Sequence, residues 1–121
     1  MKILGIDYGQ KKIGLALAEG RLAEPYKVIR YQDPGRLLRE IKEIVKRERI
    51  EKVVVGISEG KMGQETKSFA QRLGAATFDE TLSTQRAQEL SRLAVMKKKK
   101  RKALEDAFAA AVMLQSYLNY V

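Results

Sequence analysis

The chain has 121 residues, with 24 Lys and Arg against 15 Asp and Glu, a formal net charge of +9. It contains no Cys and no His, which excludes disulfides, thiolate nucleophiles, imidazole acid–base pairs and zinc sites built from those ligands. A hydrophobic content of 45% with 32% charged residues is typical of a soluble globular protein. We expect one domain over residues 1–121, a cytoplasmic location, no membrane segment and an anionic partner, with nucleic acid the first candidate.

Three short apolar segments at the start of the chain indicate strands. Residues 2–8 predict a buried strand, and a turn at Gly9 leads into a second strand over residues 13–18, so the two form a hairpin. Residues 26–31 alternate apolar and polar side chains and predict a third strand.

A helix and a central strand come next. Asp33 and Pro34 begin the helix, with Asp33 as N-cap and Pro34 at the first helical position. Apolar side chains then recur at helical spacing as far as Val45, with Lys, Arg and Glu on the other face. The β-branched run over residues 52–57 predicts a central parallel strand that is covered on both faces.

The second half of the chain is expected to alternate helices and strands before a closing helix. Glycines mark the loop after the central strand, and a Ser–Thr pair offers an N-cap for a later helix. In chain order we expect a glycine-rich loop over residues 56–63, a helix over 65–73, a strand over 75–78 ending at Asp79 and Glu80, a helix from Ser83 or Thr84 to about Val95, and a last helix over Ala103–Tyr120.

This order of elements predicts an α/β fold. Three consecutive strands form an antiparallel meander, and the two later strands follow helices, so they join the sheet as parallel neighbours. We therefore expect a five-stranded mixed sheet with helices on both faces.

Asp7 is the most informative residue because it lies in an apolar strand. A buried carboxylate costs on the order of several kcal/mol unless it is paired or bound to a metal. Pairing with Lys or backbone N–H groups is the simpler alternative.

Two more acids favour a shared site with Asp7. Glu80 follows the fifth strand, and the ends of neighbouring strands in such a sheet meet in one crevice. Asp106 lies one turn inside the last helix, where small alanines would let that helix approach the sheet. The expected stripe consists of Asp106, Ala109, Ala110 and Met113.

Three converging carboxylates cannot all stay ionised without a cation. Because His and Cys are absent, the ligands are oxygen atoms, which suit Mg²⁺ or Mn²⁺. Two such ions activate water and stabilise the leaving oxygen when a phosphodiester is hydrolysed.

Four segments in chain order carry a resemblance to a known family. They are Gly5–Gly14, Val53–Gly56 followed by Gly63, Asp79–Thr84, and Asp106–Ala110 with Leu114 and Gln115. Together they resemble the motifs of the YqgF/RuvX family, relatives of the RuvC Holliday-junction resolvases. Lys12 stands where the family usually has Arg, Ser58 where it has Pro, and Thr81 where it has Arg.

The resemblance implies a ribonuclease H-like fold and a two-metal nuclease with Asp7, Glu80 and Asp106 as metal-binding acids. It also implies Mg²⁺ or Mn²⁺ as cofactor and maturation of the 5′ end of pre-16S ribosomal RNA as the reaction. Older descriptions of the family imply junction resolution instead.

Basic side chains are concentrated beside Asp106. Lys11 and Lys12 follow Asp7 and are candidates for contact with the scissile phosphate, or they form an exposed turn. A run of six cations predicts further phosphate contacts, although such runs are often solvated loops. The run consists of Lys97, Lys98, Lys99, Lys100, Arg101 and Lys102.

Nuclease action on structured RNA, with precursor rRNA as substrate, is the leading hypothesis, for a monomer or weak homodimer. Resolution of branched, four-way DNA is the enzymatic alternative and requires a dimer. A non-catalytic RNA-binding assembly factor is a second alternative. An actin-like nucleotide-binding domain is a third, suggested by the Asp-x-Gly hairpin.

Overall fold

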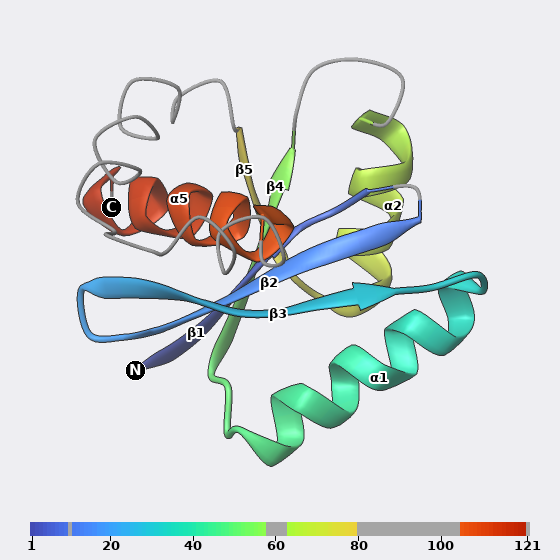
Figure 1. Ribbon diagram of the computed structural model, residues 1–121, viewed down its shortest axis with the longest axis horizontal. Coiled ribbons are helices and arrows are strands. Elements are labelled where there is room, and N and C mark those ends of the chain that lie inside the picture. The colour runs from blue at the N-terminus through green and yellow to red at the C-terminus, as the bar shows by residue number, and fades with distance from the viewer. Residues whose placement is uncertain (10, 58–62, 80–104, 121) are drawn as a thin grey trace.

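The computed structural model describes residues 1–9, 11–57, 63–79 and 105–120. In this part of the chain a five-stranded sheet carries helices on both faces (Figure 1). The strands are β1 (Lys2–Asp7), β2 (Lys12–Glu19), β3 (Leu22–Arg30), β4 (Lys52–Ile57) and β5 (Ala76–Asp79). The helices are α1 (Pro34–Arg47), α2 (Gly63–Leu73) and α5 (Glu105–Tyr120).

The sheet has the order β3-β2-β1-β4-β5. β1 pairs antiparallel with β2, and β2 pairs antiparallel with β3, whereas β4 lies parallel to both β1 and β5. The predicted mixed five-stranded α/β fold is therefore confirmed. Because β1 is central and is hydrogen-bonded on both sides, the position of its last residue is well fixed.

β3 is longer than the sequence indicated. It begins at Leu22, whereas the alternating pattern began only at Tyr26. Pro25 lies inside the strand, opposite Ala16, and the register shifts between Leu15 and Ala16. An edge strand tolerates a proline that donates no hydrogen bond, and this exception interrupts the pattern used for prediction.

Two apolar cores lie on opposite faces of the sheet. On one face Leu4 and Ile6 of β1 pack with α1 and α2. On the other face Ile3 of β1 packs with α5. Successive side chains of a strand point to opposite faces, so Gly5 and Asp7 share the α5 face with Ile3.

α1 begins as the sequence predicts. The Asp33 carboxylate accepts a hydrogen bond of 3.0 Å from the Gly35 N–H, and Pro34 occupies the first turn. At the other end the Ile50 N–H donates to the Val45 carbonyl at 2.9 Å, which closes the helix. Arg49, between them, adopts a φ of 56°, in the left-handed region where glycine is favoured.

α5 comes closest to the sheet where two strands carry glycine. A Cβ atom on Gly5 would lie 2.8 Å from Leu114 Cβ, and one on Gly14 would lie 1.8 Å from the Asp106 carbonyl oxygen. Ala109 is exposed, so its expected place in the stripe against the sheet is wrong, although Ala110 and Met113 are buried. The contact face is rotated away from Ala109 and follows Ala107, Ala110, Ala111 and Leu114.

Several sequence-based expectations lie outside the described residues. These include the helix from Ser83 or Thr84 to Val95 and the first two residues of the expected last helix. None of the described helices is long and apolar enough to cross a membrane.

Candidate active site

A row of residues crosses the sheet at the carboxyl end of β1. Asp7 is paired with Gly14 of β2 on one side and with Gly56 of β4 on the other. Gly56 is paired in turn with Phe78 of β5. Paired residues point to the same face, so this row lies on the side that α5 covers. Glycine on both sides of Asp7 leaves its carboxylate without a bulky lateral neighbour in the sheet.

Asp106 reaches this row through the backbone of α5. The Asp106 carbonyl oxygen lies only 1.8 Å from where a Gly14 Cβ would be, and the Ala107 nitrogen lies 2.7 Å from the same point. Gly14 and Asp7 are directly opposite across neighbouring strands, which are about 5 Å apart. The first turn of α5 therefore rests one strand away from Asp7, on the same face.

Glu80 lies outside the described residues. The described part of β5 ends at Asp79, which is paired with Ile57 one position beyond the row of Asp7. Among the residues that the structure describes, no group of three or more acids is close enough to hold a metal ion. The third acid of the expected set therefore rests on sequence.

Lys12 holds the Asp106 carboxylate. Its Nζ atom lies 3.0 Å from Asp106 Oδ2, and the side chains are 44% and 32% exposed. An ion pair with this much exposure contributes at most about 1 kcal/mol. The ammonium of Lys12 therefore partly neutralises Asp106, one of the two acids at this site. Lys11, in the preceding turn, is exposed, while the expected basic segment Lys97–Lys102 lies outside the described residues.

Tyr31 stabilises the chain between Asp7 and Lys12 through two hydrogen bonds. The Tyr31 hydroxyl donates to the Gly9 carbonyl, and the Tyr31 N–H donates to the Lys11 carbonyl at 3.0 Å. Burial, followed by the side-chain hydrogen bond with Tyr8, raises the pKa of the Tyr31 phenol, so that it stays protonated as a donor. The ring centroid of Tyr8 lies 6.2 Å from that of Tyr31.

Sequence reasoning missed this support for the site. Tyr31 was expected only as the last residue of a strand, and its bond to Gly9 spans 22 residues of the chain. No local pattern connects the two residues. Gly9 was the only local sequence signal for this turn. The structure shows why a glycine is needed there, because a Cβ atom would lie 2.5 Å from the Lys12 carbonyl oxygen.

The two described acids carry the kind of donor atom that a hard divalent cation prefers. Asp7 and Asp106 offer carboxylate oxygens on neighbouring strand and helix ends, and the ammonium of Lys12 already lies against Asp106. Oxygen ligands of this kind suit Mg²⁺ or Mn²⁺.

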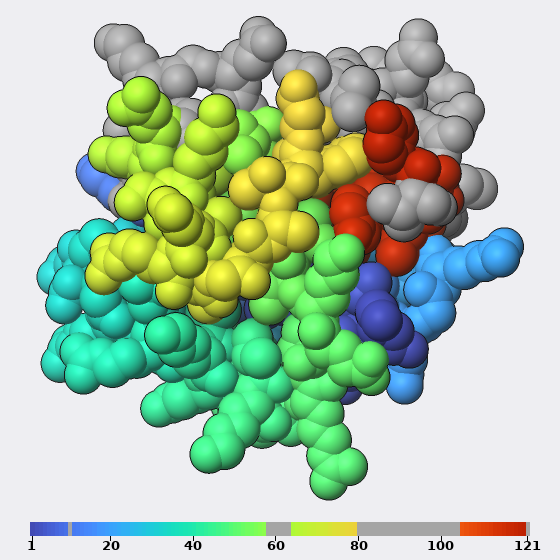
Figure 2. All heavy atoms as spheres, turned by 180° about the vertical axis from the view of Figure 1, so that it is seen from behind, coloured from blue at the N-terminus to red at the C-terminus, as the bar shows by residue number. Residues whose placement is uncertain are grey.

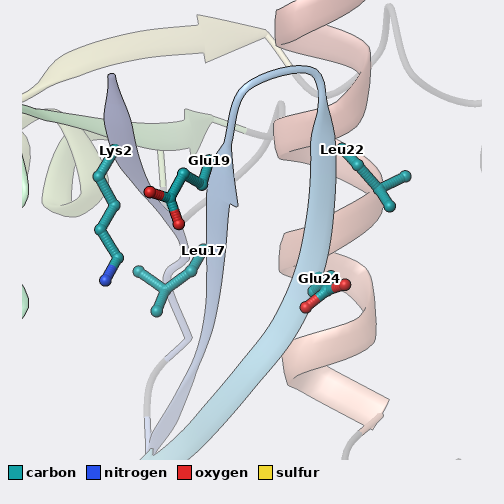
Figure 3. A pocket seen from close by; sticks show the side chains of 5 residues that line it. All are labelled: Lys2, Leu17, Glu19, Leu22 and Glu24. Atoms are coloured by element: carbon teal, nitrogen blue, oxygen red, sulfur yellow. The ribbon is translucent and has the colours of Figure 1, made fainter.

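A separate pocket lies at the opposite end of the sheet. It has a volume of about 360 Å³ and is formed by the beginning of β1 and by the β2–β3 hairpin (Figure 3). Its Lys2 amine is engaged at 3.2 Å by Glu48, outside the pocket lining. The lining residues are Lys2, Leu17, Glu19, Leu22 and Glu24.

Comparisons with known proteins agree with this architecture. The family model described as "RuvX: Holliday junction resolvase" matches residues 1–120. A protein of Carboxydothermus hydrogenoformans is 36% identical, over 99% of this chain and 97% of its own length. One of Halothermothrix orenii is 34% identical, over 99% and 96%. Both are named "Putative pre-16S rRNA nuclease".

Solved structures share the fold. Thermus thermophilus RuvC in complex with a Holliday junction substrate superposes with a TM-score of 0.67 at 20% identity, over 99% of this chain and 96% of that one. The fowlpox virus Holliday junction resolvase gives 0.64 at 12% identity, with both chains fully covered. Since the family model spans nearly the whole chain and relatives exceed 30% identity over nearly their full lengths, this chain belongs to the RuvX (YqgF) family.

Proposed function

We propose that the protein is a metal-dependent nuclease that matures the 5′ end of pre-16S rRNA in the cytoplasm. Asp7, Glu80 and Asp106 are its metal-binding carboxylates in this proposal. The observation that carries it is the contact of the Asp106 backbone with Gly14, directly opposite Asp7. The names of the relatives supply the substrate.

Asp7 and Asp106 are each held by a rigid element. Asp7 ends a strand that is paired on both sides, and Asp106 lies in the first turn of a helix packed against the sheet. Carboxylates on such elements keep their spacing while a substrate binds, which lowers the cost of reaching the reactive geometry. Bound Mg²⁺ or Mn²⁺ would supply an activated water and charge stabilisation at the leaving oxygen.

Lys12 has two successive partners in this scheme. Without a divalent cation its ammonium neutralises Asp106 at 3.0 Å. If Asp106 held a cation, Lys12 would be free of this ion pair and could contact a substrate phosphate next to the site. Its exposed side chain can reorient without disturbing a core. Lys11 and the segment Lys97–Lys102 extend the phosphate contacts in the proposal.

The test compares substrates and an active-site variant. The protein is incubated with a precursor 16S rRNA 5′ end or with a four-way DNA junction, in Mg²⁺, in Mn²⁺ or in chelator. We expect cleavage of the RNA that needs a divalent cation and that is lost in Asp7→Asn, while the variant still binds RNA.

Three outcomes would contradict the proposal. Cleavage of the junction alone would make the protein a resolvase. RNA binding without cleavage by the wild type would make it a non-catalytic assembly factor. Unchanged cleavage by Asp7→Asn would remove Asp7 from the reaction. The mass of the protein in solution, with and without RNA, distinguishes a monomer or weak homodimer from the stable dimer that resolution of a junction requires.

A further inference from the structure

The two exposed flanks of α1 differ in charge. One flank alternates in sign and carries Arg36, Glu40, Glu43 and Arg47. This flank lies toward β3, because Glu40 is 4.0 Å from Lys27 of β3 and the Arg47 guanidinium donates to the Tyr26 hydroxyl of β3 at 3.2 Å. Residues four apart on a helix are neighbours, so the opposite charges on this flank compensate one another.

The other flank carries cations, and its nearest acid is Glu43, at the border of the two flanks, four residues from Arg39 and three from Lys46. Arg39, Lys42 and Lys46 follow one another at spacings of three and four residues, and Arg49 comes three residues later. All four are exposed, and within the described part of the chain none of them forms an ion pair. We call these four residues the α1 basic row.

The α1 basic row lies on the side of α1 that is turned away from β3. β3 is one edge of the sheet, and β4 and β5 form the other side, where α2 is located. The row therefore lies toward α2, and Figure 2 shows α1 and α2 next to each other on this face of the molecule. It is a separate surface from the candidate active site, which lies under α5 on the other face of the sheet.

Two features of the row weaken the fold and so need another explanation. Like charges at helical neighbour positions, such as Lys42 and Lys46, repel each other. Arg49 has a φ of 56°, a conformation that favours glycine, and yet a long cation occupies it. Lys46, in the last turn, gains from the negative end of the helix dipole, and Arg49 lies just beyond that end.

We infer that the α1 basic row binds the phosphate backbone of the RNA substrate at a distance from the scissile bond; this inference rests on the proposed nuclease function. From Arg39 to Lys46 the row extends for about 10 Å at 1.5 Å per residue, and Arg49 follows just beyond the end of the helix. One strand of a nucleic acid duplex presents about three phosphates over that length. The three helical cations therefore match about three anions, and Arg49 adds a fourth positive charge at the end of the row.

α1 starts at the active-site end of the molecule and carries the row away from it, toward the amino end of β1, where the Glu51 N–H donates to the Lys2 carbonyl. α1 starts just after Tyr31, whose N–H bonds to Lys11, and Lys12 is paired with Arg30. RNA that contacts Lys11 and Lys12 can therefore continue over this end of the sheet and along α1. A membrane surface fits less well, because the large exposed apolar side chains among the described residues, Met1, Leu22 and Tyr120, are not on α1.

The test is a pair of charge-matched variants. Arg39→Gln/Lys42→Gln/Lys46→Gln removes three cations from the row, and Lys27→Gln/Arg36→Gln/Arg47→Gln removes three from the flank of mixed charge. Binding is measured against salt with a long precursor RNA and with a short RNA that covers only the cleavage site. Thermal unfolding followed by circular dichroism checks that both variants fold.

We expect the row variant to bind the long RNA at least about tenfold more weakly and to lower the salt slope by about 0.9 for each duplex phosphate that the row no longer binds. Binding of the short RNA should not change, and the control variant should bind both RNAs as the wild type does. Equal losses of RNA affinity in both variants would mean that only the net charge of the protein matters, and this would overturn the inference. Unchanged binding of the long RNA by the row variant would also overturn it.

The two proposals fail in different ways. Binding is measured without cleavage, so a protein that binds long RNA through the row but does not cut it would refute only the nuclease proposal. A protein that cuts normally and whose row variant binds normally would refute only the inference about the row.

Discussion

Substitution of Gly14 by Ala perturbs the contact that brings Asp106 to Asp7. The added methyl group would lie 1.8 Å from the Asp106 carbonyl oxygen, whereas ordinary contact begins at 3.4 Å, so 3.4 − 1.8 = 1.6 Å of separation is missing. The atoms that it meets are backbone atoms of Asp106 and Ala107, which cannot rotate away. The first turn of α5 must therefore move away from β2.

The cost follows from that displacement. Overpacking of a well-packed site costs about 1–3 kcal/mol, and a backbone obstacle places Gly14→Ala at the upper end, about 3 kcal/mol in the free energy of unfolding. The total free energy of unfolding of a domain of this size is about 6–18 kcal/mol, so the variant still folds. A shift of about 1 Å at a reacting group costs about 100-fold in rate, so we expect at least that loss of metal-dependent cleavage.

The assay uses two other glycines as controls. Gly5→Ala obstructs the same helix at Leu114, with a closest distance of 2.8 Å, far from Asp106. It should lower the free energy of unfolding but leave Mn²⁺ binding unchanged. Gly35→Ala meets nothing closer than 3.4 Å and should not destabilise the protein. Wild-type stability in Gly14→Ala, or reduced stability with wild-type Mn²⁺ affinity and cleavage, would refute the reasoning.

Three further substitutions test other parts of the structure. Lys12→Gln removes the cation that competes for Asp106, so calorimetry should give Mn²⁺ binding up to about fivefold tighter, together with weaker RNA binding. Arg49→Gly relieves the left-handed conformation, and urea titration should show a gain of about 0.5–1 kcal/mol in the free energy of unfolding while RNA affinity falls. Hydrogen bonds from Lys2 and then Tyr26 hold the pKa of Glu48 below its usual value. Their stabilisation is present above the unfolded-state pKa and is lost as the pH falls through the folded one, so Glu48→Gln should be less stable than wild type at pH 7, and this difference should shrink as the pH falls through the folded-state pKa.

The fold could be predicted where a local pattern determines the element. α1 follows from Asp33, Pro34 and the apolar repeat, and β4 follows from its β-branched run. The beginning of β3 could not be predicted, because Pro25 interrupts the alternation and is tolerated only since this strand is at the edge of the sheet. That condition is a property of the whole sheet.

The candidate site, too, could be predicted only where a local pattern determines it. A carboxylate at the end of an apolar strand marks Asp7 from the sequence alone. The closeness of α5 was expected from Ala109 and Ala110, of which only Ala110 is buried, and it also depends on Gly14 in a strand that is distant in the chain. The support given by Tyr31 and the neutralisation of Asp106 by Lys12 are also non-local contacts between side chains. The charges of the α1 basic row were visible in the sequence, but the contrast between the two flanks needed the contacts with β3.

The central claim is that Asp7 and Asp106 bind the same divalent cation. Isothermal titration of Mn²⁺ into the wild type, Asp7→Asn, Asp106→Asn and Asp33→Asn tests it most directly. Asp33→Asn removes a carboxylate at the start of α1, on the other face of the sheet from α5, and keeps a side chain that caps the helix. We predict wild-type affinity in Asp33→Asn and at least tenfold weaker binding in each of the other two variants. Wild-type Mn²⁺ affinity in Asp106→Asn would contradict the claim.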